Sequence, residues 1–109
     1  MLQDCYLNFT INDLVLDADG VAKALMQACR RTHGARVQCV LQLRDEITVV
    51  LSEAPQCPQD LHFELALNCS MDEIKGKLAA RWQGGYDPVG MIYDESEADS
   101  RAFILFQKI

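Results

Sequence analysis

The sequence lacks any Cys-x-x-Cys pair, although it contains five cysteines, an odd number. Zinc sites and disulfide frameworks are usually built from cysteines at close, regular spacing, so the scatter favours reduced thiols that pack as small hydrophobic groups. Reduced thiols are typical of the cytoplasm. The first residues also lack the basic segment and the continuous apolar segment of a secretory signal. Together these absences predict a cytoplasmic protein.

Long apolar runs and positive charge are scarce too. No apolar run approaches the roughly 20 residues that a membrane-spanning helix requires. Sixteen acidic residues outnumber ten basic ones, and the formal net charge of −6 disfavours contact with a phosphate backbone. Arg30, Arg31 and Arg81 fall in the last turns of predicted helices, where they complement the helix dipole. The sequence therefore predicts no membrane and no nucleic-acid partner.

The motifs of the common enzyme classes are missing as well. Gly84 and Gly85 are accompanied by neither the lysine of a phosphate-binding loop nor the spacing of a dinucleotide fingerprint. No Ser-His-Asp pattern is visible, so we assign no catalytic residue, no metal ligand and no cofactor. The 109 residues, half of them apolar, are enough to form the core of one domain without a metal or a disulfide.

The second half of the chain is the more regular one. Apolar and polar residues alternate over residues 61–68, which is typical of a half-buried strand. A capping box that begins at Ser70 predicts the start of a helix, and Gly84 predicts its end. Residues 86–93 and 101–106 follow as two strands. This half therefore reads as strand, helix, strand, strand.

The first half repeats this order more loosely. A strand over residues 5–11 precedes a helix whose N-cap is Asp17 or Asp19 and whose end is marked by Gly34. Two alternating runs within residues 37–52, separated by a short polar turn, then predict an antiparallel hairpin. The order of elements is the same in both halves, which suggests an internal duplication.

The spacing supports this duplication. Fifteen residues separate Asp19 from Gly34, and fifteen separate Ser70 from Gly85. A linker over residues 54–60 contains two prolines and joins the two units. The chain is thus predicted to be a single domain over residues 1–109, composed of one unit over residues 5–53 and another over 61–109.

Each unit has one helix with an apolar stripe and three strands with one apolar face. The simplest way to cover both is an α+β fold, a two-layer α/β sandwich with an antiparallel sheet of about six strands and two helices on one face. We expect Ile74, Leu78 and Trp82 to anchor the second helix, and Gly76 in that helix to mark a close packing contact.

The opposite face of the sheet is too apolar to lie in water. The last strand is apolar on both faces, and such strands are usually covered on both sides. We therefore expect a homodimer through this face. The candidate interface residues are Val40, Val50, Ile92, Phe103 and Leu105. A shallow ligand site is the alternative, and its candidate polar residues are Tyr6, His62, Glu64 and Tyr93.

Cysteine and histidine spacings leave less specific candidates. Cys29 and His33 are spaced like neighbouring metal ligands on a helix, but no second pair completes the set, so a core thiol is favoured. Cys69 precedes a helix cap and, with His62, would form a nucleophilic pair only if the fold brought the two together. Cys57 lies between the linker prolines and is expected to be exposed.

Acidic residues give two further patterns. Asp17 and Asp19 precede Gly20 as in a calcium loop, but the first and twelfth loop positions would be apolar, so a capped helix start is favoured. A cluster of carboxylates in the last hairpin is read as a solvated loop rather than a cation site. Its members are Asp94, Glu95, Glu97 and Asp99.

The pattern from residue 74 onward resembles a family of small bacterial domains of unknown function, the DUF4177 type. It rests on Leu78, on the pairs Gly85-Tyr86 and Val89-Gly90, and on the terminal run Phe103-Ile-Leu-Phe-Gln-Lys108. Pro88 stands where that pattern usually carries a leucine. The resemblance implies a small α/β domain that self-associates, and it brings no catalytic residue.

The leading interpretation is a non-enzymatic cytoplasmic protein that self-associates as an interaction or binding module. The alternative is a small-molecule-binding or enzymatic domain with a pocket between helix and sheet or at a dimer seam. A cluster of polar groups with shifted pKa values in a concave pocket would favour the alternative.

Overall fold

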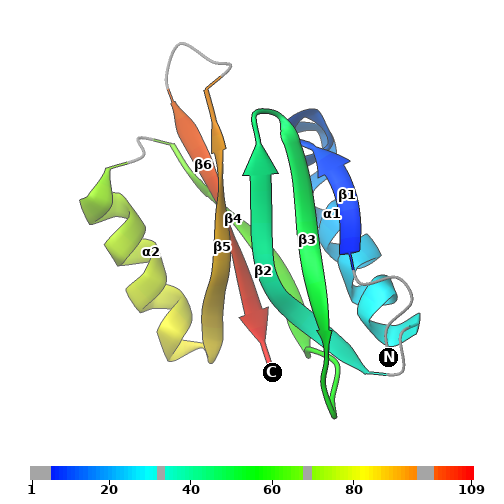
Figure 1. Cartoon of the computed structure of the whole chain (residues 1–109). Helices are drawn as coiled ribbons and strands as arrows, with labels where there is room; N and C mark the ends of the chain where they lie inside the picture. Colours follow the sequence, from blue (N-terminus) through cyan, green and yellow to red (C-terminus); the bar gives the residue numbers. More distant parts are fainter. Residues whose placement is uncertain (1–5, 32–33, 68–69, 96–99) are drawn as a thin grey trace.

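The computed structural model describes residues 6–31, 34–67, 70–95 and 100–109 (Figure 1). Its two helices and six antiparallel strands confirm the predicted α+β class, and the order strand, helix, strand, strand occurs twice. The elements are β1 (Tyr6–Thr10), α1 (Ile11–Arg31), β2 (Ala35–Leu43), β3 (Glu46–Glu53), β4 (Asp60–Ala66), α2 (Met71–Gln83), β5 (Tyr86–Asp94) and β6 (Arg101–Lys108).

The strands form two three-stranded sheets rather than one sheet of six. The orders are β1-β3-β2 and β4-β6-β5, so both units place their last strand in the centre. Both also carry a bulge at the same place, between Val37 and Cys39 and between Pro88 and Gly90, which lie 51 positions apart. A bulge occurs at a particular position of a particular strand. Its presence at the same position in both units therefore supports the duplication more strongly than the order of elements does.

Two capping residues shape α1. Thr10 and Asp13 cap its start reciprocally, since the Thr10 hydroxyl accepts from the Asp13 N–H and the Asp13 carboxylate from the Thr10 N–H. The helix is kinked at Asp17, which has extended backbone angles (φ −160°, ψ 77°). The Asp17 carboxylate accepts the Gly20 N–H at 2.9 Å and so caps the longer second segment, as the sequence predicted.

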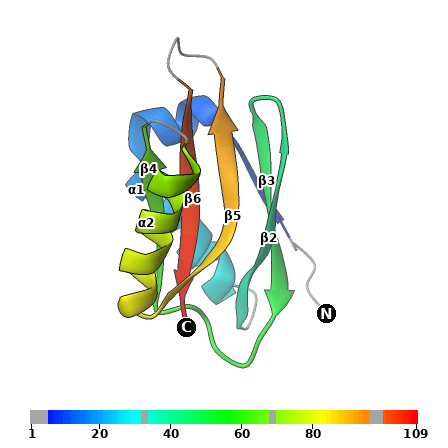
Figure 2. The same ribbon diagram turned by 90° about the vertical axis from the view of Figure 1, so that its left-hand side faces the viewer.

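The main core lies where α1 packs against both sheets. Because the sheets meet at an angle, α1 lies on the inner side of each (Figures 1 and 2). The residues of α1 that are fully buried are Leu14, Leu25 and Cys29. They share one cluster with apolar residues of both sheets, including Ile47, Val49, Leu51, Leu61, Phe63, Ile92, Phe103 and Leu105.

The second helix lies on the other side of its sheet, so the two helices do not share one face. Phe103 and Leu105 point toward α1, whereas Ile104 and Phe106, also buried, point to the opposite face of β6. That opposite face also carries Glu64 of β4, which α2 contacts through Arg81. The cause is the apolar character of β6 on both faces, because such a strand is stable only when both sides are covered.

The packing of α2 differs from the expectation. No α2 residue is fully buried; Ile74 and Leu78 are half-buried, and Trp82 is 70% exposed, so the tryptophan is not a core anchor. A Cβ added to Gly76 would meet nothing within 4 Å, and the expected close contact is therefore absent there. Ser70 caps the helix as predicted, since its hydroxyl accepts the Glu73 N–H.

The bulge at Gln38 changes which residues of β2 face inward. The predicted alternation would put Val37, Leu41 and Leu43 on one buried face. Val37 is buried, but Leu41 and Leu43 are 57% and 73% exposed. A bulge adds one residue to one strand, and a one-residue shift moves every later side chain to the other face.

Candidate functional site

Two glutamine side chains join the sheets where β2 meets β5 and β6. The Gln42 amide donates to the Tyr93 carbonyl at 2.6 Å and accepts from the Tyr93 N–H at 2.9 Å. The Gln107 amide does the same for Val37, accepting its N–H at 2.8 Å and donating to its carbonyl at 3.1 Å. Each side-chain amide thus makes the two hydrogen bonds, one to an N–H and one to a carbonyl, that the backbone of a neighbouring strand would make in a continuous sheet.

A cavity of about 790 Å³ lies beside the Gln42 contact, where the two units meet. It is bordered by the first turns of α1, the β2–β3 turn, the end of β5 and the start of β6. Its lining residues are Ile11, Asn12, Val15, Gln42, Arg44, Asp45, Tyr93, Asp94, Glu95 and Arg101. Tyr93, a predicted ligand-binding residue, therefore lies in the cavity.

Charges of both signs line this cavity. Asp94 is completely buried, and the Arg101 Nε donates to its carboxylate at 2.8 Å, which neutralises it. Arg44 adopts a positive φ of 58°, which is uncommon for a residue with a side chain. Of the predicted acidic loop, Asp94 is thus a paired core residue and Glu95 lines the cavity, whereas Glu97 and Asp99 lie outside the described residues.

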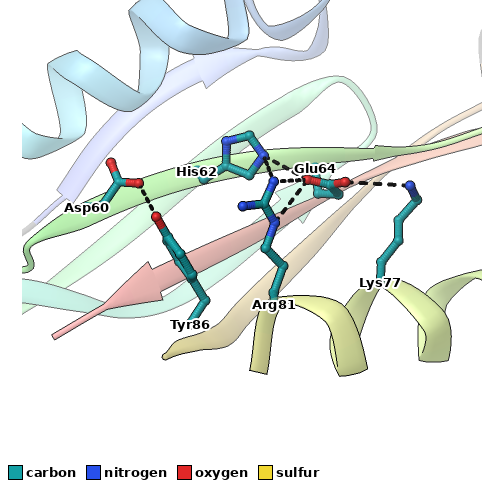
Figure 3. Close-up of polar contacts among 6 residues, drawn as sticks. All are labelled: Asp60, His62, Glu64, Lys77, Arg81 and Tyr86. Carbon is teal, nitrogen blue, oxygen red and sulfur yellow. Dashed lines mark hydrogen bonds and ion pairs between the residues drawn. The ribbon is translucent and has the colours of Figure 1, made fainter. Parts of the chain in front are cut away.

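His62 and Glu64, two of the three other predicted ligand residues, come together on the side of β4 that faces α2 (Figure 3). The Arg81 Nη2 lies 2.6 Å from Glu64 Oε2, and Arg81 Nε donates to the same oxygen at 3.2 Å. His62 Nε2 is 2.7 Å from that oxygen and 2.8 Å from Arg81 Nη2. Lys77 Nζ is 3.6 Å from the other carboxylate oxygen. These contacts attach α2 to β4.

The electrostatics of this cluster suit a structural tether better than a general base. Partial burial opposes ionisation of Glu64, but the hydrogen bonds and charges of Arg81 and His62 outweigh it and lower the Glu64 pKa. A catalytic carboxylate would need the opposite shift. The role of His62 Nε2 depends on the tautomer of the ring: this nitrogen accepts from Arg81 when it carries no hydrogen and donates to Glu64 when it carries one.

Tyr86 and Asp60 extend the cluster along the same side (Figure 3). The Tyr86 hydroxyl donates to the Asp60 carboxylate, and this bond, aided by desolvation, raises the pKa of Tyr86. Arg81 lies 5.4 Å and Lys108 5.7 Å from the centre of the Tyr86 ring, within cation–π range. Tyr86 was not among the predicted site residues, because alternation alone gave it no partner.

The Cys29 thiol is a poor nucleophile. Cys29 is fully buried, and burial raises the pKa of its thiol to about 11, with a smaller contribution from Cys57. Cys57 is half-buried rather than exposed, and its thiol donates to the Cys29 carbonyl at 3.4 Å. His33 and Cys69 lie outside the described residues.

The described residues were also searched for a metal site and for a membrane-spanning helix. No three His, Cys, Asp or Glu side chains come together there as a metal site would require. Neither helix, within the same residues, is long and apolar enough to cross a bilayer.

Within the described residues, no helix or strand covers the outer face of the sheet β1-β3-β2. Figures 1 and 2 show both helices away from this side of β2 and β3. Register places three rows of side chains on it, each across β1, β3 and β2: Tyr6, Val50 and Cys39; Asn8, Thr48 and Leu41; Thr10, Glu46 and Leu43. We call this surface the open face.

The predicted interface residues divide between two places. Ile92, Phe103 and Leu105 are buried in the core of the single chain, so the cover that their strands required comes from α1. Val40 also packs toward the core. Val50 lies on the open face together with Tyr6, which is 56% exposed. Leu41 and Leu43 are its most exposed large apolar members, and they were not predicted because the bulge reverses their direction.

Comparison of the chain with protein-family models, curated proteins and solved structures found no match. The resemblance of the second half to DUF4177-type domains therefore stays a prediction.

Proposed function

We propose that the protein is an interaction module that self-associates through the open face. The observation that carries this proposal is the exposure of Leu41 and Leu43 on an uncovered three-stranded sheet. Solvent-exposed leucines that are adjacent on a sheet are typical of surfaces that bind another protein. The thiols of Cys39 and Cys57, which form no disulfide within the described residues, support the cytoplasmic location proposed with it.

The distribution of charge favours a second copy as the partner. The chain has 26 charged side chains, yet the three rows of the open face and the Arg36–Ser52 row that continues them carry only two, Glu46 at one end and Arg36 at the other. Two molecules with a net charge of −6 repel each other over most of their surface. A face with almost no charge is where they can meet, and the same face on both copies gives a closed two-fold dimer.

The size of the face sets the expected affinity. Three strands about 4.8 Å apart, each with about six residues rising 3.3 Å, cover roughly 15 by 20 Å. That is about 300 Å² per copy and roughly 600 Å² in total, which is below the roughly 1,200–2,000 Å² of stable interfaces and in the range of weak, transient ones. We therefore expect a dimer whose population depends on concentration.

Leu41→Glu is expected to weaken the dimer at least about tenfold, because it buries a carboxylate twice in a symmetric interface. Sedimentation velocity over a concentration series measures the dissociation constant. Leu67→Glu is the matched control, since Leu67 is equally exposed, at 60%, but lies beyond β4 in the other unit. A wild-type chain that stays monomeric at high concentration would refute the proposal.

The cavity supports a second candidate function, the binding of a small molecule. Its volume of about 790 Å³ is that of a ligand pocket, and it combines an apolar wall at Ile11 and Val15 with polar groups such as Tyr93. It also lies at the seam between the two duplicated units, a preferred place for such sites.

A ligand in this cavity is expected to raise the melting temperature by roughly 5 °C at about ten times its dissociation constant. Thermal unfolding with a panel of amino acids, polyamines and nucleotides measures this shift. Val15→Trp fills the cavity and should abolish the shift, whereas Leu16→Trp, at a neighbouring exposed position outside the lining, should preserve it. Equal shifts in both variants would place the ligand elsewhere.

A further inference from the structure

The two ends of the open face carry opposite charges. Arg36 of β2 pairs in register with Ser52, and Glu46 of β3 pairs with Leu43. Both charged side chains are exposed, and neither makes an ion pair within the described residues. Register puts them on the same side as Leu41, because cross-strand partners point to the same face and Thr48, the partner of Leu41, is two residues from Glu46.

The charged ends are placed symmetrically along the central strand β3. Arg36 of β2 lies beside Ser52 of β3, which is three residues after Val49 along that strand. Glu46 is itself on β3, three residues before Val49. At about 3.3 Å per residue, the ends are roughly 20 Å apart. A two-fold axis at the level of Val49 and perpendicular to the strands therefore exchanges the level of Arg36 with that of Glu46.

We propose that two copies pack open face to open face with their strands antiparallel, so that Arg36 of each copy lies against Glu46 of the other. This inference rests on the proposed self-association and adds its geometry. Rotation about such an axis also keeps each strand opposite its own copy. Leu41 then lies opposite Cys39 of the second copy, and Leu43 lies opposite the aliphatic stem of its Arg36, whose guanidinium reaches Glu46 on the neighbouring strand β3. The two ion pairs close the interface at both ends.

The alternative two-fold arrangement is electrostatically worse. An axis parallel to the strands would keep both copies running in the same direction. Since β3 is the central strand, Glu46 would then face Glu46 of the second copy, and Arg36 would have no acidic partner. Like charges placed directly opposite each other oppose association. The pattern of charges thus selects one orientation for the dimer.

Charge reversal tests this orientation directly. Arg36→Glu and Glu46→Arg are each expected to raise the dissociation constant about tenfold, because each turns two attractive pairs into two repulsive ones. The double variant R36E/E46R restores both pairs and is expected to return to within about threefold of the wild type. Analytical ultracentrifugation at low ionic strength gives all four constants.

The net charge supplies an internal control. Glu46→Arg makes the chain less negative, so a non-specific charge effect would strengthen association where the proposal requires weakening. Lys23→Glu, on exposed surface of α1, has the same effect on net charge as Arg36→Glu but should leave the dimer unchanged. Circular dichroism and thermal unfolding of each variant confirm that it is folded.

The outcomes separate the orientation from self-association itself. Weakening in both single variants and recovery in the double variant support the antiparallel dimer. A wild-type dimer that Leu41→Glu disrupts but the charge variants do not would leave the open face as the interface and overturn the orientation. A monomeric wild type would overturn both.

Discussion

Gly90→Ala is expected to lower the free energy of unfolding by about 2–3 kcal/mol, because it forces atoms apart at the seam between the two sheets. A Cβ at this position would lie 2.5 and 2.6 Å from two carbon atoms of Val40. Val40 is a short, stiff side chain on β2 and packs against the main core. Because one of the two atoms is the Cβ of Val40 itself, a change of rotamer cannot relieve this contact.

Gly76→Ala is the matched control and is expected to change stability in the opposite direction. Gly76 lies inside α2, where a Cβ would meet nothing within 4 Å. Alanine is favoured over glycine in a helix by about 1 kcal/mol, so this variant should be more stable than the wild type. Urea unfolding followed by circular dichroism measures both changes. If Gly90→Ala left the free energy of unfolding unchanged, the two sheets could move apart at this point without a loss of stability.

The sequence was sufficient for the elements and their order. Alternation predicted the strands, and Ser70 and Gly84 mark the ends of α2, whereas Asp17 marks the kink inside α1, which already begins at Ile11. These signals are local, since a cap depends on a few neighbouring backbone groups. The duplication was visible for the same reason, because each unit repeats the same local signals at the same spacing.

The arrangement of the elements could not be predicted in the same way. The bulge at Gln38 has no glycine or proline to mark it, yet it turns Leu41 and Leu43 out of the core. The apolar faces of β6 did indicate cover on both sides. The apolar pattern of β6 did not indicate what covers each face. A second molecule was one possibility, but Phe103 packs in the cluster that contains the helix of the other unit.

The candidate sites were predictable only as residue types. Glu64 and His62 alternate with apolar residues on one strand, which put them on the same face. Their partner Arg81 is 17 residues away and was assigned to the helix dipole alone. The cavity could not be predicted, because its walls come from α1, the β2–β3 turn, β5 and β6. Among its residues only Tyr93 had been predicted to bind a ligand, whereas Asp94 and Glu95 had been interpreted as part of a solvated loop.

Gln107→Leu should be the most damaging polar-to-apolar change at the seam, with a loss of about 3 kcal/mol in the free energy of unfolding. Gln107 is 5% exposed, and its amide satisfies both the N–H and the carbonyl of Val37. Leucine has a similar volume, so the core stays filled. Both Val37 groups would nevertheless remain buried without a partner, at a cost of about 1–3 kcal/mol each.

Gln42→Leu removes the same pair of contacts at the other end of the seam, and its loss is expected to be only about 1 kcal/mol. The Tyr93 backbone groups that it satisfies are part-buried and border the cavity, where water can replace the amide. Unfolding of both variants in urea, with unchanged slopes, gives the comparison. The physical claim is that burial of the orphaned backbone, not the number of bonds removed, sets the loss. Equal losses at Gln107 and Gln42 would contradict it, and would mean that the two sheets are held together by apolar packing alone.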